Sequence, residues 1–158
     1  MKTIKIKKGE IIQRKGDQRT KIYSVVAGLL RSYSIDEKGR EHIFLFAPEN
    51  WVIADSNSAT EPAELFIDAL EDSEIVIKEK SELVDNHTEK LLKRVAVLQK
   101  RVIMLMSASA IERYEHFVST YPEVVQRVPQ KMIASYLGIT PEALSKVKKE
   151  RFTDNKYK

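Results

Sequence analysis

The sequence QKMIASYLGITPEALSKVKK, residues 130–149, has the spacing of two short helices joined by a tight turn. Gly138 stands where such a turn needs positive φ, Thr140 is a favourable N-cap, and Pro141 suits the first position of the next helix. On both sides of the turn, apolar residues recur at helical spacing, so each helix has one inner face. The stretch therefore predicts a helix-turn-helix. The inward-facing residues are Ile133, Ala134 and Leu137 in the first helix, and Leu144 and Val147 in the second.

The outer face of the second predicted helix is polar and basic. Glutamate can accept a hydrogen bond from cytosine N4, lysine can donate to guanine, and serine can bond several base edges. Basic residues farther along, Arg151 included, can hold phosphates, which set affinity but not sequence. We therefore predict that this face enters the major groove of DNA; the alternative is a helical hairpin that only packs. The predicted DNA-binding residues are Thr140, Pro141, Glu142, Ser145, Lys146, Lys148 and Lys149.

Charge is divided unevenly along the 158-residue chain, whose formal net charge is +4. Residues 1–86 carry 13 basic and 16 acidic side chains, whereas residues 87–158 carry 14 basic and 7 acidic ones. The basic half would attract phosphate, although a solvated lysine-rich surface has the same composition. No run approaches the roughly 20 apolar residues that span a bilayer, so we expect a cytoplasmic protein with no membrane partner.

Residues 4–80 have the pattern of short antiparallel strands. Segments rich in β-branched and aromatic residues alternate with turn signals, and four of the five glycines fall among them. This spacing indicates an antiparallel sandwich or barrel. The predicted strands are residues 4–8, 22–26, 29–35, 42–46 and 74–78.

A long helix is predicted from residue 86 to about residue 110. Two apolar stripes follow it in alternating steps of four and three residues, the spacing of a coiled-coil seam. One stripe can pack on the chain's own strands and the other on a second copy, so we predict a homodimer; the alternative is one helix buried in a monomer. The predicted interface is Leu91, Val95, Leu98, Val102, Leu105 and Ser109, and the second stripe is Leu92, Ala96, Gln99, Ile103, Met106 and Ala110.

From residue 6 to about residue 149 the chain resembles the Crp/Fnr family of bacterial transcription regulators. One group of segments resembles the family's cyclic-nucleotide-binding β-roll, a double-stranded β-helix, and two others resemble its dimerisation helix and its helix-turn-helix. The β-roll segments are residues 8–12, 16–17, 22–28 and 71–75; the helix is residues 88–110; the helix-turn-helix is residues 127–146, in the form of Bacteroidetes members.

The resemblance implies an α+β fold in three parts. Residues 1–85 would form a sensory-type β-roll, residues 86–111 the dimerisation helix, and residues 112–158 the helix-turn-helix domain. It also implies a homodimeric, sequence-specific regulator that binds two-fold-symmetric double-stranded DNA, with RNA polymerase as a further partner. A hypothesis from another class is a β-roll module for small ligands or protein interaction whose C-terminal helices have lost DNA binding.

The β-roll departs from the pattern of family members that bind cyclic AMP. Those members hold the phosphate with a Gly-Glu-Leu stretch and an Arg-Ser or Arg-Ala pair. The corresponding residues 51–69 contain no Arg or Lys, and they include acidic residues such as Asp55 and Glu64. We therefore expect no cyclic AMP binding and no cofactor, and the effector is unidentified or absent. Aromatic residues could line a cavity for another ligand, although we favour a plain core for them: Phe44, Phe46, Trp51 and Phe66.

Residues that could carry catalysis or hold a metal are sparse. The chain has no cysteine, which excludes thiolate zinc, iron–sulfur clusters and thiol catalysis. Its three histidines, His42, His87 and His116, fall in three different segments, whereas a metal needs several convergent ligands. No Gly-rich phosphate loop follows a predicted strand. We expect neither an enzyme nor a metal protein.

Overall fold

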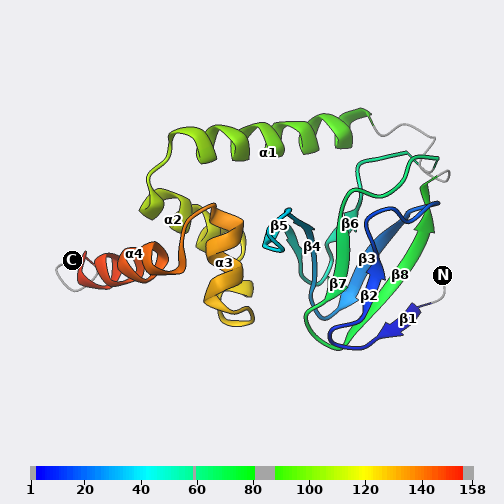
Figure 1. The fold of residues 1–158 in the computed structure, drawn as a ribbon, viewed down its shortest axis with the longest axis horizontal. Helices are drawn as coiled ribbons and strands as arrows, with labels where there is room; N and C mark the ends of the chain where they lie inside the picture. Colours follow the sequence, from blue (N-terminus) through cyan, green and yellow to red (C-terminus); the bar gives the residue numbers. More distant parts are fainter. Residues whose placement is uncertain (1–2, 59, 81–87, 155–158) are drawn as a thin grey trace. The chain divides into compact units, whose positions relative to one another are not determined.

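The computed structural model describes residues 3–58, 60–80 and 88–154 (Figure 1). The chain divides into two compact units, residues 1–85 and residues 86–158. The described strands lie in the first unit, and the described α-helices lie in the second. Among the described residues, no helix has the length and apolar character that a membrane span needs.

The first unit consists of two four-stranded antiparallel sheets, with strand orders β1-β8-β3-β6 and β2-β7-β4-β5. The expected antiparallel sandwich is confirmed, in a jelly-roll-like arrangement. Three strands that the sequence pattern did not indicate, β2, β6 and β7, complete the two sheets. The strands are β1 (Thr3–Ile6), β2 (Ile11–Gln13), β3 (Lys21–Ala27), β4 (Leu30–Ile35), β5 (Glu41–Ala47), β6 (Val52–Ala54), β7 (Phe66–Ala69) and β8 (Ser73–Glu79).

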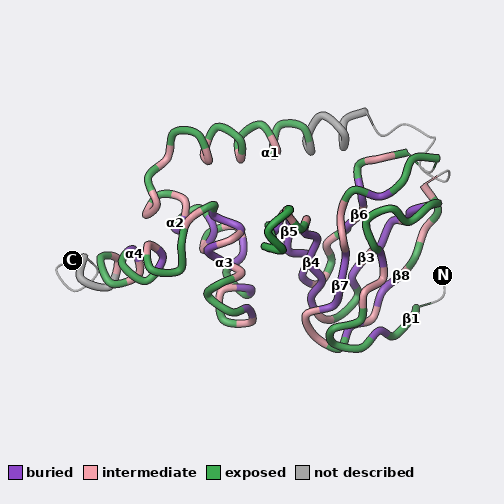
Figure 2. Tube along the Cα trace, in the orientation of Figure 1, coloured by how far each residue is buried: buried purple, intermediate pink, exposed green. Residues whose placement is uncertain are grey.

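The core of the first unit lies between its two sheets. Side chains alternate across each strand, so every second residue faces inward: on β3, Tyr23 and Val25 are buried and Ser24 is not. Figure 2 shows the buried stretches running along the strands. Each buried aliphatic side chain contributes about 1.5–3 kcal/mol, so this cluster is the main force that joins the sheets. Its members are Ile6, Tyr23, Val25, Leu30, Leu45, Ala47, Ile53, Ile67, Ala69 and Ile75.

Gly28 allows the close passage of the chain between β3 and β4. Its φ of +93° lies in the left-handed region, and a β-carbon there would overlap the hydroxyl of Ser73. That hydroxyl accepts the N–H of Leu29 at 3.2 Å and donates to the carbonyl of Glu71 at 2.8 Å. Only glycine satisfies both the backbone angle and the space at this corner.

A buried ion network joins three strands on the other face of the second sheet. Arg31 on β4 donates two hydrogen bonds to the Asp68 carboxylate on β7, at 2.8 and 2.9 Å, and two to Glu41 on β5, at 2.6 and 3.4 Å. Burial disfavours the guanidinium charge, but these two carboxylates outweigh it and raise the pKa of Arg31 above its usual value. Because the bonds are directional, the network favours the pairing of β4 with β5 and β7.

The described part of the second unit, residues 88–154, forms four α-helices and a short 3-10 helix. Phe117, Tyr121 and Tyr136 form an aromatic cluster at its centre, with ring centroids 5.3–5.6 Å apart. Leu144 and Val147 of α4 are also buried, and α2 packs on both α3 and α4. The helices are α1 (Thr88–Ser107), α2 (Ala110–Thr120), η2 (Val124–Gln126), α3 (Gln130–Leu137) and α4 (Pro141–Asp154).

The prediction that one helix continues through Ser109 is wrong. Helix α1 ends at Ser107, and Ser109 is the N-cap of α2. Its hydroxyl accepts the N–H of Glu112, while the Glu112 carboxylate accepts the N–H of Ser109 at 2.7 Å. The side chain of Ser109 lowers the pKa of Glu112. This reciprocal capping box starts a new helix, so Ser109 does not extend the stripe of α1.

Candidate functional site

The turn between α3 and α4 has the geometry that its sequence predicts. Gly138 has a φ of 66°, and the N–H of Ile139 donates to the carbonyl of Ala134 at 3.0 Å, which closes the end of α3 in a Schellman-type motif. The hydroxyl of Thr140 accepts the N–H of Ala143 at 3.2 Å and caps α4, which begins at Pro141. The orientation of α4 about its own axis is therefore fixed locally.

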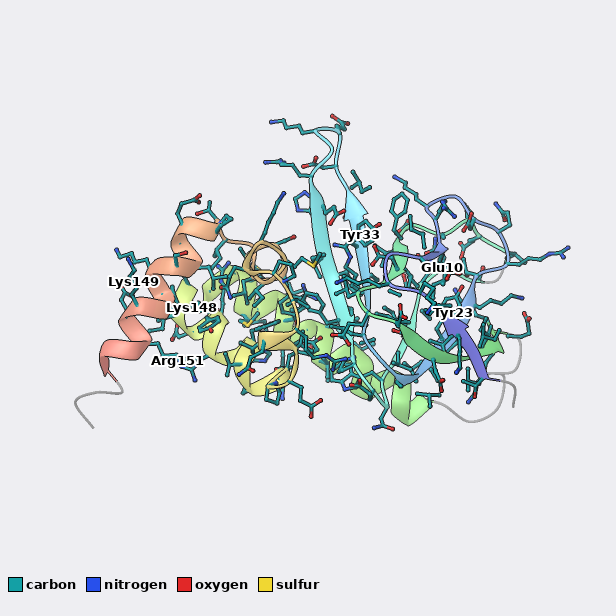
Figure 3. All side chains as sticks on the ribbon, turned by 90° about the horizontal axis from the view of Figure 1, so that it is seen from below. Glu10, Tyr23, Tyr33, Lys148, Lys149 and Arg151 are labelled. Atoms are coloured by element: carbon teal, nitrogen blue, oxygen red, sulfur yellow. The ribbon has the colours of Figure 1, made fainter. Side chains whose placement is uncertain are left out.

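Helix α4 has one buried side and one exposed polar side. Leu144 and Val147 are buried. Lys148 is half-buried at the border of the two sides, and Arg151 lies with its guanidinium 5.6 Å from the centroid of the Tyr114 ring. Figure 3 shows Lys148, Lys149 and Arg151 along the same helix. Of the predicted DNA-binding residues, all but Lys148 are exposed: Thr140, Pro141, Glu142, Ser145, Lys146 and Lys149.

The exposed side of α4 presents both an acceptor and donors. A hydrogen bond from its own backbone N–H and one from Thr140 lower the pKa of Glu142, so this carboxylate is ionised at neutral pH. Lys146 lies 4.0 Å from the Glu150 carboxylate with both side chains in solvent, an arrangement that holds the ammonium group only weakly. Ser145 donates to the carbonyl of Pro141 at 3.0 Å and keeps its acceptor capacity. Such a set can pair with base edges and with phosphates.

The predicted seam on α1 is divided between two sides of the helix. Leu98 and Leu105 are half-buried, whereas Val95 and Val102 are exposed. The side chain of Leu91 lies outside the described residues. The described part of α1 is largely exposed (Figure 2). Exposed neighbours from the second stripe continue the surface formed by Val95 and Val102, and they again follow alternating steps of four and three: Gln99, Ile103 and Met106, the last 81% exposed.

In the first unit, Asp55 organises the segment that follows β6. Asp55 is only 4% exposed. Its carboxylate accepts the backbone N–H groups of Asn57, Glu64 and Leu65, each at 2.9 Å. Lys80 donates to the backbone carbonyls of Asp55 and Asn57 from the other side. From the sequence, the acidic residues of this segment, Asp55 among them, are expected to repel a phosphate. In the structure the Asp55 carboxylate is turned inward and accepts hydrogen bonds from backbone amides.

The four aromatic residues considered as a ligand pocket are divided between the two sheets. Phe44, Phe46 and Phe66 lie on strands of the second sheet, whereas Trp51 directly precedes β6 of the first sheet. Phe44 and Trp51 pack against the core between the sheets. Phe66 stacks on Tyr33, with ring centroids 5.3 Å apart, and Phe46 lies opposite Arg31 in the register of β4 and β5. Strand alternation puts Phe46 and Phe66 on the face away from the core. The four side chains therefore do not face one common space.

The two histidines that the structure describes, His42 and His116, make local contacts. His42 Nε2 lies 3.0 Å from the Asp36 carboxylate, and this contact is the main cause of the lowered pKa of Asp36. His116 is exposed on α2, and its Nδ1 lies 3.4 Å from the hydroxyl of Thr120. His87 lies outside the described residues. Within the described ranges, no group of three or more His, Asp or Glu side chains is arranged to hold a metal ion.

Comparisons with known proteins match the first unit to a family and most of the chain to a curated relative. The family described as the cyclic nucleotide-binding domain matches residues 3–85. A curated relative, Electron transport regulator A from Shewanella oneidensis, is 24% identical over 90% of this chain, and the chain spans 65% of that relative's length.

Two solved structures share the fold. FixK2 from Bradyrhizobium japonicum has a TM-score of 0.79 at 21% identity, covering 98% of this chain and 85% of its own. A CRP/FNR-family transcriptional regulator from Thermus thermophilus has a TM-score of 0.77 at 19% identity, covering 97% and 87%. At these identities the likeness concerns the fold.

The φ of Gly138 gives a stability prediction. Gly138→Ala is expected to lower the free energy of unfolding of the second unit by about 1–2 kcal/mol, because alanine disfavours the left-handed region. Crowding adds little, since a β-carbon would lie 3.7 Å from its nearest neighbours, an ordinary contact. Thermal unfolding of the full chain, followed by circular dichroism, measures the loss. Gly138→Asn is the control and should lose less, since asparagine tolerates this conformation; an alanine variant as stable as the wild type contradicts the argument.

Proposed function

This chain belongs to the cyclic nucleotide-binding domain family, and we propose that it is a sequence-specific DNA-binding transcription regulator of the Crp/Fnr type. The observation that carries the proposal is the exposed polar side of α4, which lies opposite the buried side chains of Leu144 and Val147. With α3 and the Gly138 turn, α4 forms a helix-turn-helix in which α4 is the recognition helix. The shared fold with solved CRP/FNR-family regulators supports this assignment. The narrower assignment to a Bacteroidetes type stays a prediction.

In this proposal, α4 enters the major groove with its N-terminal end nearest the bases. Ionised Glu142 would accept from cytosine N4, and Lys146 would donate to guanine O6 and N7. Lys148 and Lys149 would contact phosphates, which adds affinity for any sequence. The positive end of the α4 dipole, at Thr140 and Pro141, also favours a nearby phosphate.

We further propose that the protein acts as a homodimer through α1. The apolar surface formed by Val95, Val102, Ile103 and Met106 is exposed in a single chain. A second α1 would cover it with the same surface, as a two-fold interface requires. Two recognition helices would then meet half-sites about 34–36 Å apart on two-fold-symmetric DNA. A cytoplasmic location and contact with RNA polymerase follow from such a function and stay predictions.

We propose that cyclic AMP is not the effector. The amides of Glu64 and Leu65 already donate to the Asp55 carboxylate, so a phosphate would have to displace a buried anion. Residues 51–74 supply no Lys or Arg to hold that phosphate, and Lys80 already donates to the backbone carbonyls of Asp55 and Asn57. Arg31 is engaged by two carboxylates of the same unit. Any effector therefore has another chemistry, or the protein acts without one.

DNA recognition is tested by substitutions on α4. Lys149→Ala should weaken binding to all duplexes by a similar factor and reduce the salt slope by about 1. Lys146→Ala and Glu142→Ala should instead relax the preference at one base pair by about 1–3 kcal/mol. Selection from random duplexes, followed by titrations at several salt concentrations, separates the two effects.

A matched control for these variants is Lys100→Ala, which removes an exposed positive charge from α1. It should leave the base preference unchanged. If the wild type binds no duplex in a salt-dependent way, the regulator proposal fails and the alternative, a β-roll module for ligands or protein interaction, takes its place.

The dimer is tested by a pair of aspartate substitutions on α1. Val102 and Val97 are similarly exposed, at 54% and 56%, but lie about 140° apart around the helix. Val102→Asp should convert a micromolar dimer into a monomer, because it puts a charge in the apolar surface. Val97→Asp should leave the dimer intact. Sedimentation velocity distinguishes these outcomes; a monomeric wild type that still binds two-fold-symmetric DNA would refute the interface.

The effector prediction is tested by thermal unfolding with cyclic AMP. A ligand at a hundred times its dissociation constant would stabilise the native protein by about 2.7 kcal/mol. We expect no shift for the wild type at millimolar cyclic AMP. Asp55→Ala is the matched control for the role of the carboxylate: it should melt at a lower temperature, since three amides lose their acceptor. A concentration-dependent rise in the wild-type melting temperature contradicts the prediction.

A further inference from the structure

The side chain of Arg113, in α2, reaches the C-terminal ends of two other helices. Its Nη2 donates to the carbonyl of Leu105 in the last turn of α1 at 2.7 Å, and its Nε donates to the carbonyl of Ala108, which directly follows α1, at 3.0 Å. Its Nη1 donates to the carbonyl of Leu137, the last residue of α3, at 3.2 Å. One guanidinium therefore joins the ends of α1 and α3.

These carbonyls are suitable partners for a positive charge. The last carbonyls of a helix have no partner within it, and they carry the negative end of the helix dipole. Arg113 is the fourth residue of α2, near the end where a positive charge is unfavourable for α2 itself. Its position is explained by the ends of α1 and α3, not by its own helix. A planar guanidinium can donate in several fixed directions at once, which an ammonium group cannot do.

A second set of contacts joins α1 to the end of α3 and to the turn at Gly138. Arg101 of α1 donates to the carbonyl of Tyr136 at 3.3 Å, and its guanidinium lies 4.0 Å from the centroid of the Tyr136 ring. The side chain of Leu105 lies beside Gly138, 3.7 Å from where a β-carbon would stand. The C-terminal part of α1 thus contacts the end of α3 and the turn at Gly138, directly before α4 begins at Pro141.

We propose that Arg113 is a positioning residue that fixes the direction of α3 and α4 relative to α1, and so sets the half-site spacing that the dimer accepts. The inference rests on the proposed function, since it assigns the spacing to a residue that touches no DNA. In a dimer joined along α1, the separation of the two α4 helices depends on the α1–α3 junction. Helix α4 packs through its buried side chains Leu144 and Val147, and the three hydrogen bonds of the guanidinium go to Leu105, Ala108 and Leu137, not to α4. Loss of Arg113 should therefore loosen the direction of α4 without unfolding it.

The first experiment measures binding to symmetric operators whose half-sites are moved apart or together by one or two base pairs. Each inserted base pair turns one half-site by about a tenth of a helical turn, so the wild type should lose about tenfold or more in affinity per base pair. Arg113→Met should flatten this profile to within about threefold while single half-site affinity is kept. Arg113→Lys keeps the charge but not the forked geometry, and should give an intermediate profile.

A matched control for charge is Lys100→Met, which should keep the narrow spacing profile of the wild type. If folded, dimeric Arg113→Met has a profile as narrow as the wild type, the inference is wrong. If that variant does not fold, the decision passes to Arg113→Lys, for which an unchanged narrow profile is equally decisive.

A DNA-independent measurement separates this inference from the proposed function. The chain contains no cysteine, so Lys100→Cys on α1 and Lys146→Cys on α4 can be spin-labelled specifically. Labelled chains diluted with unlabelled ones report the distance within one chain. We expect a narrow distance distribution with Arg113 and a broad one with Arg113→Lys. An unchanged distribution overturns the positioning role even if DNA binding is never observed, whereas a broad one supports it even then.

Discussion

The left-handed turn at Gly138 is the constraint on which the second unit depends. It ends α3 through the hydrogen bond from Ile139 to Ala134, and two residues later Thr140 caps α4. The rotational setting of α4 follows from this short segment: Leu144 and Val147 are buried, and most of its polar residues turn to solvent. The proposed contacts with DNA all derive from that setting, since a rotation of α4 by one residue, about 100°, would bury part of the polar side.

In each unit, charged side chains bond to buried backbone groups or to one another. In the first unit, Asp55 accepts backbone amides and Arg31 is bonded to carboxylates from two neighbouring strands. In the second, Arg113 supplies donors to carbonyls at two helix ends. Buried polar groups without partners are costly, so such contacts specify one arrangement. In the first unit, the backbone amides of Glu64 and Leu65 already donate to Asp55, so neither is free to bind a phosphate.

Sequence patterns predicted β1 and the longer strands and missed the short strands β2, β6 and β7. β3, β4, β5 and β8 have six or seven residues each, enough for a period of two to be visible. β2 and β6 have three residues, too few to show a period, and they are held by pairing with distant strands. The end of α1 was missed because apolar spacing continues through it, although Ser109 and Glu112 carry the local sign of a new helix.

The sequence by itself determined the turn from α3 to α4 and the polar side of α4, because glycine, threonine and proline act through their own backbone within a few residues. Only the tertiary structure decided which side of α1 stays exposed: Leu98 and Leu105 alternate with Val95 and Val102 in one apolar pattern, yet only the two valines remain exposed. It also decided the partners of Asp55 and Arg113. These hydrogen bonds depend on direction and distance between segments, and spacing along a chain carries no record of either.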